Sequence, residues 1–346
     1  MLLLVIQCTV YADQIESNYI DDTHKAISKK VVDWSNALDT TLNDWVKDKE
    51  EEDVKDTEDN ATDLVSELPV NTLEEKVNYV DTFFQSDKYL EETENTFVRV
   101  RTGGYFQSKD SSDFDVSLSA QMPFKKSRKN IKIFIENMNA DNAGNVLQDK
   151  TESPDIGINY FRPEKFGLNS KYSLGFSGIH PFTRARYNLP FSTNEWLIDA
   201  SQSFKYSTKN KFEEETNIYF DRELPEKKLL RLQLHRKTQE EIDGMEYIFS
   251  AQYYCCRKKN TGLRFSQMFI GHTKYQYTVD TGTLPLQEKT FGGINNYVSA
   301  VTWRRNIWRK WFYYEVSPAV SFEKQYDYEP NYTIRLSFDF YLGKYN

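Results

Sequence analysis

The sequence predicts an all-β transmembrane barrel of antiparallel strands in up-and-down order, preceded by an acidic α-helical extension. We expect about fourteen strands, and twelve or sixteen are also compatible with the pattern. Three observations predict this fold. Apolar and polar residues alternate from residue 97 onward, the alternating segments are each about ten residues long, and the connections between them alternate in length and charge.

The first twelve residues, MLLLVIQCTVYA, are uncharged and mostly apolar, and Asp13 follows at once. Val10 and Ala12 place small residues at the third and first positions before that point, as a signal-peptidase site requires. The stretch lacks a positive n-region and is shorter than the usual signal peptide of about 15–30 residues. We therefore expect residues 1–12 to be a secretory signal peptide whose start lies upstream.

Residues 13–96 form an acidic extension with 24 Asp and Glu against 8 Lys and Arg, a net charge of −16. Two apolar stripes at helical spacing predict two amphipathic helices, which either pack on each other or mediate self-association. Residues 48–63 between them are too acidic to pack, so we expect a disordered linker. The first stripe consists of Ile27, Val31, Trp34, Leu38, Leu42 and Trp45, and the second of Leu73, Val77, Val80 and Phe84.

From residue 97 the hydrophobic period changes to two, which predicts strands with one apolar and one polar face. In the last segment, Tyr332 and Phe338 share the apolar parity, while Arg335 and Asp339 share the polar one. The barrel is therefore expected over residues 97–346. Its fourteen segments lie near residues 97–107, 113–123, 130–139, 154–163, 170–179, 182–190, 194–207, 211–223, 228–239, 245–256, 262–275, 294–305, 310–324 and 331–343.

The length of the segments and the placement of aromatic residues favour lipid over a protein core around the apolar face. A tilted strand of about ten residues crosses a bilayer, whereas strands of globular proteins average nearer five or six. Trp308 and Trp311 gather at one set of strand ends, and Tyr326 and Tyr328 at the other, as in interfacial girdles. A closed barrel is also the only sheet that spans lipid without exposing unpaired backbone groups. Outer-membrane lipid is thus the expected surrounding.

The connections also predict the orientation, if the first strand runs outward. The outer loops, which include residues 140–155, 238–244, 279–293 and 325–331, are longer and mostly acidic, whereas the inner turns are short and basic. With an even number of strands both termini lie on the inner side, which places the extension in the periplasm. The inner turns define a periplasmic basic rim that consists of Lys125, Lys126, Arg128, Arg257, Lys258, Lys259, Arg305, Arg309 and Lys310.

Opposite charges on the extension and on this rim attract within a Debye length of about 8 Å. We therefore expect the acidic extension to dock on the rim or to enter the lumen as a plug. The alternative is a tethered arm or coiled coil that does not touch the barrel.

The polar parity of the strands carries charges of both signs, which would face the lumen. Such charges either line a water-filled, weakly selective pore, as charged rings do in channels, or form salt-bridge ladders that fill a medium-sized barrel. Acid partners for the arginines on neighbouring strands would favour the filled lumen. The lumen-lining candidates are Arg184, Arg186, Arg231, Arg264, Arg304, Arg335, Asp199, Glu215, Glu315 and Asp339.

Three segments carry a resemblance to a known family: PFTRARY at 181–187, WRRNIWRKWFYYEVSPAVSF at 303–322 and LSFDFYLG at 336–343. Together they resemble proteobacterial outer-membrane β-barrels with an arginine pair after Pro-Phe, a Trp-then-Tyr-Glu-x-x-Pro penultimate strand and a final strand ending in Phe- or Leu-Gly. The resemblance covers about residues 97–343. It implies an outer-membrane location in a Gram-negative bacterium but no catalytic or ligand-binding residues. This chain departs from many such barrels by continuing into GKYN.

The residues that carry catalysis are sparse, so we expect a porin-like or weakly selective channel, or else a structural barrel, rather than an enzyme. The sequence GFSGIH brings Ser177 near His180, but on one strand residues three apart face opposite sides, and the sequence is not a G-x-S-x-G elbow. The adjacent Cys255 and Cys256 lack metal-site spacing and are expected to be small apolar fillers. We expect no cofactor, no metal and no nucleic acid. The alternatives for a partner of the extension are a second copy of the chain and a periplasmic protein.

Overall fold

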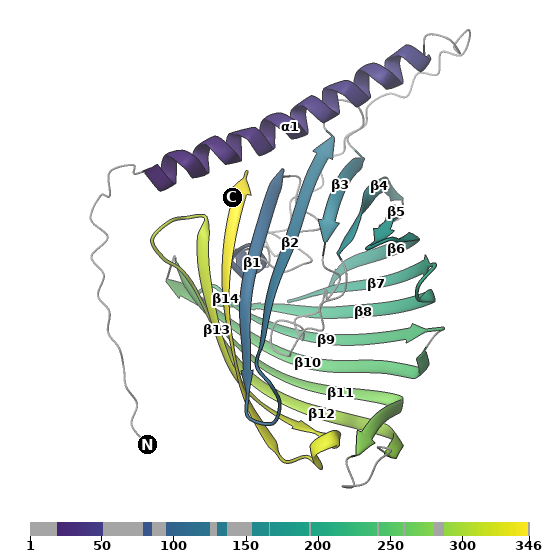
Figure 1. Cartoon of the computed structure of the whole chain (residues 1–346), viewed down its shortest axis with the longest axis vertical. Coiled ribbons are helices and arrows are strands. Elements are labelled where there is room, and N and C mark those ends of the chain that lie inside the picture. Colours follow the sequence, from purple (N-terminus) through teal and green to yellow (C-terminus); the bar gives the residue numbers. More distant parts are fainter. Residues whose placement is uncertain are drawn as a thin grey trace.

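The computed structural model describes residues 19–50, 79–84, 95–124, 130–136, 154–165, 167–193, 195–240, 242–258, 260–279 and 287–344. Fourteen strands of this part of the chain pair antiparallel into one closed barrel (Figure 1), in which each strand neighbours the next and the last pairs with the first. They are β1 Phe97–Gln107, β2 Asp113–Phe124, β3 Ile131–Glu136, β4 Asp155–Lys165, β5 Leu168–Ser177, β6 His180–Thr193, β7 Trp196–Ser207, β8 Lys211–Leu224, β9 Lys228–Gln239, β10 Ile242–Lys258, β11 Thr261–Val279, β12 Gln287–Asn306, β13 Phe312–Glu323 and β14 Pro330–Gly343.

The prediction of a fourteen-stranded antiparallel barrel is confirmed, but four strands are at least five residues longer than predicted, among them β6, which was predicted over 182–190. β10, β11 and β12 extend beyond the predicted 245–256, 262–275 and 294–305, and the β11–β12 hairpin still pairs Val279 with Gln287. Much of the predicted loops 238–244 and 279–293 is therefore strand. Alternation reveals a strand only where its two faces meet different surroundings. In these strands the backbone pairing continues beyond the part of the wall that separates two different surroundings.

Closure brings β1 and β14, the first and last strands, side by side in an antiparallel register. Arg101 lies opposite Asp339, and Phe97 lies opposite Gly343. The backbone hydrogen-bonding groups along both strands are thereby paired, so the sheet has no open edge there.

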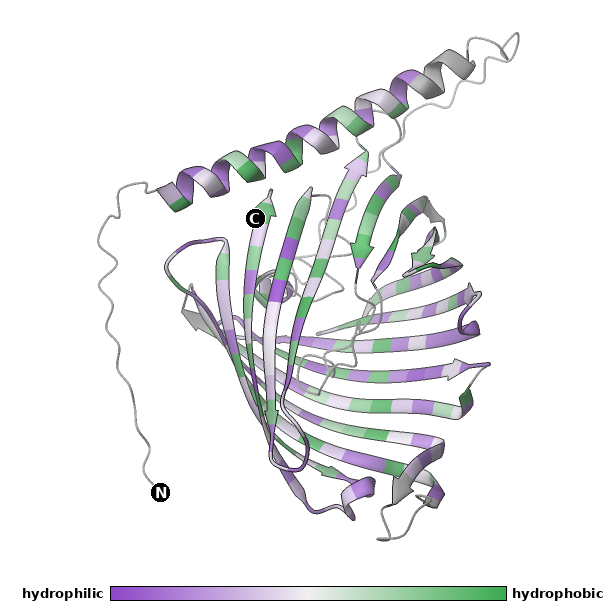
Figure 2. Cartoon of the chain, in the orientation of Figure 1, coloured by the Kyte–Doolittle hydropathy of each residue, from purple (hydrophilic) through white to green (hydrophobic). Residues whose placement is uncertain are grey.

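The two faces of the barrel wall differ in chemistry, and hydrophobic and hydrophilic residues alternate along the strands (Figure 2). On β14, Tyr332 is 65% exposed and Phe338 is 44% exposed, whereas Arg335 and Asp339 are buried. Phe114 and Val116 on β2 are also exposed. The apolar parity faces outward and the polar parity faces the enclosed side.

The helix α1, Tyr19–Glu50, lies across one end of the barrel against β14, β1 and β2 (Figure 1). Asp21 forms an ion pair with Arg309 of the predicted basic rim. The ring of His24 stacks on Trp311 at 4.3 Å between centroids, and Ser35 hydrogen-bonds Thr96. The prediction that the extension docks on the rim is confirmed.

The face of α1 that meets the barrel differs from the predicted stripe. Val31 of the predicted stripe is buried, but Ile27, Trp34 and Leu38 are 43%, 63% and 43% exposed. Ser35 and Asp39, four and eight residues after Val31, are buried instead. Small and polar side chains at this spacing let the helix approach the polar strand ends, and the large apolar residues consequently point elsewhere.

The rest of the extension is described only in part. Residues 1–12, Leu73 and Val77 lie outside the described residues, as does most of the predicted linker, although α1 continues through Glu50. Residues 79–84 form a helical turn, here called the lumen segment. None of the helices described here is long and apolar enough to cross a membrane.

The predicted basic rim is likewise described in part. Lys125, Lys126, Arg128 and Lys259 lie outside the described residues, and Arg257 and Lys258 are described in their backbone alone. Arg305 lies near the end of β12, and Arg309 and Lys310 lie in the turn that follows. Arg309 is the member of this rim that pairs with α1 through Asp21.

Candidate lumen site

All ten predicted lumen-lining residues lie on the inward parity of their strands. Eight of them are at most 5% exposed, and Arg186 and Glu215 are half-buried. Charged groups buried this deeply are stable only when they are paired and hydrogen-bonded. The structure of the inner wall therefore depends on how its charged side chains pair with one another.

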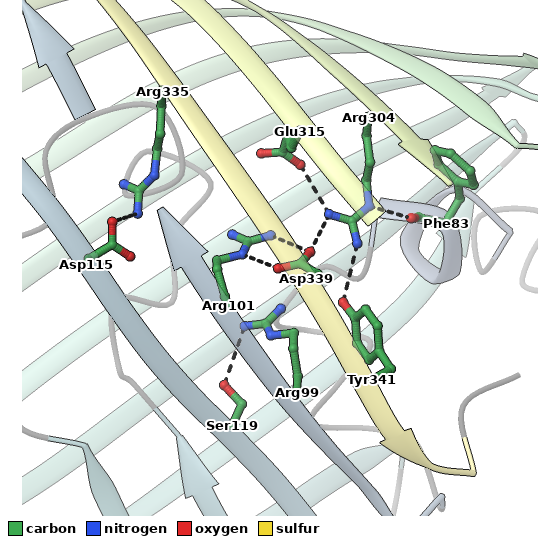
Figure 3. A network of polar contacts seen from close by, with 10 residues as sticks. All are labelled: Phe83, Arg99, Arg101, Asp115, Ser119, Arg304, Glu315, Arg335, Asp339 and Tyr341. Atoms are coloured by element: carbon green, nitrogen blue, oxygen red, sulfur yellow. Dashed lines mark hydrogen bonds and ion pairs between the residues drawn. The ribbon is translucent and has the colours of Figure 1, made fainter. Parts of the chain in front are cut away.

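The centre of one network is Asp339, at the seam where β14 meets β1 (Figure 3). Arg101 donates to it from Nε at 2.6 Å and from Nη2 at 3.0 Å, and Arg304 donates from Nη1 at 2.6 Å. Arg304 also donates to Glu315 at 3.3 Å and to the hydroxyl of Tyr341 at 3.3 Å. The network thus connects β1, β14, β13 and β12 from inside the barrel.

The lumen segment enters the barrel and meets a second buried arginine. Arg231 donates from Nη1 and Nη2 to the two carboxylate oxygens of Asp81, at 2.9 and 3.0 Å. On its other side it donates from Nε and Nη2 to Asp221 of β8, both at 2.7 Å. Arg231 is 1% exposed, and both of its acid partners are buried. The prediction that part of the acidic extension enters the lumen is confirmed.

The rest of the lumen segment packs against the wall beside Asp81. The carbonyl oxygen of Phe83 accepts a hydrogen bond from Arg304 Nε at 3.0 Å, as Figure 3 shows. The ring of Phe84 lies 5.9 Å from the guanidinium of Arg264. Val80, Phe83 and Phe84 form an apolar cluster with the wall residues Leu229, Tyr254, Cys256, Tyr313 and Tyr341.

Further ion pairs follow the inner wall away from the lumen segment. Arg184 pairs with Glu136, and Lys205 pairs with Asp155 at 2.9 Å. Arg335 donates to Asp115 at 3.1 Å.

The arginines proposed to distinguish a pore from a filled barrel are not all paired alike. Arg184 and Arg231 have acid partners, and Arg186 is attracted electrostatically to Glu215. Arg264 donates to the hydroxyl of Thr302 and faces the Phe84 ring. Asp199 is buried on the inward parity of β7.

Sequence reasoning did not identify Asp81, Phe83 and Phe84 as lumen residues. Val80 and Phe84 were assigned to an amphipathic helix of the extension, and a single turn within a barrel has the same spacing. The available signal was Asp81, which follows Val80 directly and stands two residues before Phe83. An acid within an apolar stretch is suited to pair with a buried base. Asp155 was assigned both to the end of an outer loop and to the start of a predicted strand; it begins β4 and pairs with Lys205.

The relation of Ser177 to His180 also differs from the prediction. The two residues do not lie on one strand, because β5 ends at Ser177 and β6 begins at His180. They are opposite each other in the hairpin register, and so lie on the same side of the sheet. His180 Nδ1 lies 3.3 Å from the hydroxyl of Thr208. The absence of enzymatic activity stays a prediction.

Within the described ranges, no group of three or more His, Cys, Asp or Glu side chains is placed to hold a metal ion. Cys255 and Cys256 are free thiols.

No model of a known protein family matches the chain, and no curated protein matches it. Among solved structures it is similar to OmpT, an outer-membrane protein of Vibrio cholerae, at 8% identity and a TM-score of 0.42, over 71% of this chain and 97% of that one. An anion-selective porin from Comamonas acidovorans gives 8% and 0.43, over 71% and 98%. OccK10 of Pseudomonas aeruginosa gives 6% and 0.41, over 72% and 98%. Likenesses this low carry no information on activity, and the fold is established by the chain's own strand pairing.

Proposed function

We propose that this protein is an integral outer-membrane β-barrel of a Gram-negative bacterium that acts as a porin-like channel for small solutes, narrowed by its own lumen segment. The outward face supports the membrane location, because exposed apolar residues on β2, β5 and β14 would meet water in a soluble protein. Val116, Leu174 and Tyr332 are each more than 60% exposed. A lipid surrounding removes that cost. If the first strand runs outward from the periplasm, α1 lies on the periplasmic side of the membrane.

The observation that carries the channel proposal is the helical turn inside the barrel. Barrels of eight strands are filled by the side chains of their own walls, and those of sixteen or more leave an aqueous channel. Here the wall leaves room for residues 79–84, and a helix with its side chains is about 10 Å across. Departure of the lumen segment would vacate a passage of that order between polar walls.

A second candidate is a structural barrel with a permanently filled lumen. This candidate is favoured by the network of Arg101, Asp339, Arg304 and Glu315. Paired charges stiffen the wall, and because they neutralise one another they leave no net electric field that would select solutes. In this case the lumen segment would be a fixed part of the core.

Planar-bilayer conductance of the refolded protein tests the proposal. We expect low conductance from the full chain and higher conductance from a chain that lacks residues 13–90, because the deletion removes α1 and the lumen segment. Both proteins should first show the heat-dependent migration in SDS that closed barrels show. A folded, deleted chain that does not conduct would favour the structural barrel.

A further inference from the structure

The wall that holds the lumen segment has the features of a binding site for an organic anion. We propose that Arg231 and the apolar wall beside it bind a carboxylate-bearing solute with an aromatic or short aliphatic group, and that Asp81, Phe83 and Phe84 occupy this site in its absence. The inference deepens the proposed channel function by assigning its solute class.

The contact between Arg231 and Asp81 is the first step. Two nitrogens of one guanidinium meet two oxygens of one carboxylate, which is the bidentate geometry by which arginine recognises any carboxylate. Nothing in that contact depends on the carboxylate belonging to the chain. A solute carboxylate can take the same place.

Arg231 is held ready for such a ligand by the wall itself. Asp221 accepts from its Nε and Nη2 on the side away from the lumen segment, and the ring of Tyr219 lies 5.5 Å from the guanidinium. These partners belong to β8, so they stay when Asp81 leaves. The guanidinium group therefore keeps its orientation, and binding of a solute requires little reordering of Arg231.

The charge of the surrounding wall also favours an anion. The lumen segment contacts three arginines of the wall, Arg231, Arg264 and Arg304. Arg304 in turn shares Asp339 with Arg101 (Figure 3). A carboxylate in the place of Asp81 therefore lies among several guanidinium groups.

The apolar wall beside Arg231 indicates what the carboxylate should be attached to. Phe83 and Phe84 pack on Tyr254 and Tyr313 edge to face, at centroid distances between 5.1 and 6.1 Å. Both rings lie on Gly262, where a Cβ atom would come within 2.7 Å of Phe83 and 2.9 Å of Phe84. The space that these rings leave fits an aromatic or short aliphatic group better than a sugar or an inorganic anion.

The lumen segment and the solute exclude each other, because both use the same two nitrogens of Arg231. A tethered carboxylate competes at a high local concentration. The intact protein should therefore bind the solute weakly, and removal of the Asp81 charge should strengthen the binding.

Phenylacetate is a suitable probe, and calorimetric titration of the refolded full-length protein measures its affinity. We expect Asp81→Asn to bind phenylacetate at least about tenfold more tightly than the unchanged protein. Phenylacetamide, which has the ring but no charge, should bind neither protein. Arg231→Lys in the Asp81→Asn background keeps the positive charge beside Asp221 but loses the fork, and should weaken binding about tenfold.

Asp21→Asn is the matched control, because it removes an acid of the same extension that pairs with an arginine outside the lumen. It should leave the affinity for phenylacetate unchanged. Equal affinities of Asp81→Asn and the unchanged protein, or equal binding of phenylacetamide, would overturn the inference.

Conductance of the same variants separates this inference from the proposed function. If Asp81→Asn conducts more but does not gain affinity for phenylacetate, the site assignment is wrong and the channel stands. If it gains affinity but neither it nor the chain lacking residues 13–90 conducts, the site stands and the channel is wrong.

Discussion

At the scale of single residues, the protein depends on arginines that are buried inside a barrel. Arg231 and Arg304 are 1% and 0% exposed, and each uses carboxylates of at least two separate segments. A buried ion pair contributes little net stability, but removal of one partner leaves an uncompensated buried charge. The acids that face these arginines are therefore the most sensitive positions of the wall.

Asp339→Asn should destabilise the barrel strongly, because it leaves Arg101 and Arg304 without their shared carboxylate. We expect a loss of about 3–5 kcal/mol in the free energy of unfolding, measured by urea titration of the refolded protein in lipid vesicles. Glu329→Gln removes an exposed acid that pairs with Lys109 and should leave the unfolding midpoint unchanged. Similar midpoints for both variants would show that the Asp339 network does not hold the seam.

Gly262→Leu should displace the lumen segment, because a side chain at this position would occupy the place of the Phe83 and Phe84 rings. Overpacking of this kind costs about 1–3 kcal/mol, so the bound state of the segment becomes less populated and conductance rises. Gly104→Leu is the control, since its side chain would meet the rings of Phe106 and Phe114 and not the segment. Equal conductance of the two variants would contradict the contact between the lumen segment and Gly262.

At the scale of elements, α1 and the lumen segment are two separate contacts of one extension with the barrel. α1 crosses the rim and meets it through Asp21, His24 and Ser35, whereas the lumen segment contacts the inner wall. The exposed residues Ile27 and Trp34 show that α1 is not fully covered by the barrel. Docking of α1 should therefore be weaker than insertion of the lumen segment.

Reversal of the charge at Asp21 should loosen α1 from the rim. In Asp21→Arg we expect trypsin to cleave at Lys29 and Lys30 roughly fivefold faster, which corresponds to about 1 kcal/mol for a partly buried pair. Adding Arg309→Asp restores opposite charges and should return cleavage toward its original rate. A double variant that is cleaved as fast as the single one would show that this ion pair does not fix α1.

At the scale of the whole molecule, the chemistry of the outward face determines whether the barrel is stable in water or in lipid. In water, replacement of an exposed apolar residue by arginine is nearly neutral, whereas in lipid the same change near the middle of a strand costs about 2–4 kcal/mol. Val116 lies opposite Thr102, near the middle of the β1–β2 hairpin, and is 69% exposed.

Val116→Arg should accordingly lower the free energy of unfolding in lipid vesicles by about 2–4 kcal/mol. Ile179→Arg, in the two-residue turn between β5 and β6 and 86% exposed, should change it little. The same proteins should fractionate with the outer membrane. Equal stability of the two variants, or recovery of the protein in the soluble periplasm, would contradict the membrane location.

The sequence by itself determined the local part of this structure. Strand positions follow from alternation, since a strand between two different surroundings must alternate, and even β1 and β14 were located closely in this way. The same alternation correctly assigned Arg304 and Asp339 to the inward face and Phe338 to the outward face. The long hairpin of β11 and β12 was underestimated because alternation fades outside the apolar band while backbone pairing continues.

Only the tertiary structure decided which partners these residues have. Arg101 meets Asp339 because closure brings the first and last strands together, and Asp81 meets Arg231 across 150 residues of chain. No local pattern encodes such contacts, because a charge on the inward parity can pair with any strand that the closed barrel places opposite it. The alternation therefore determined the wall of this barrel, and the closure of the sheet determined what occupies its lumen.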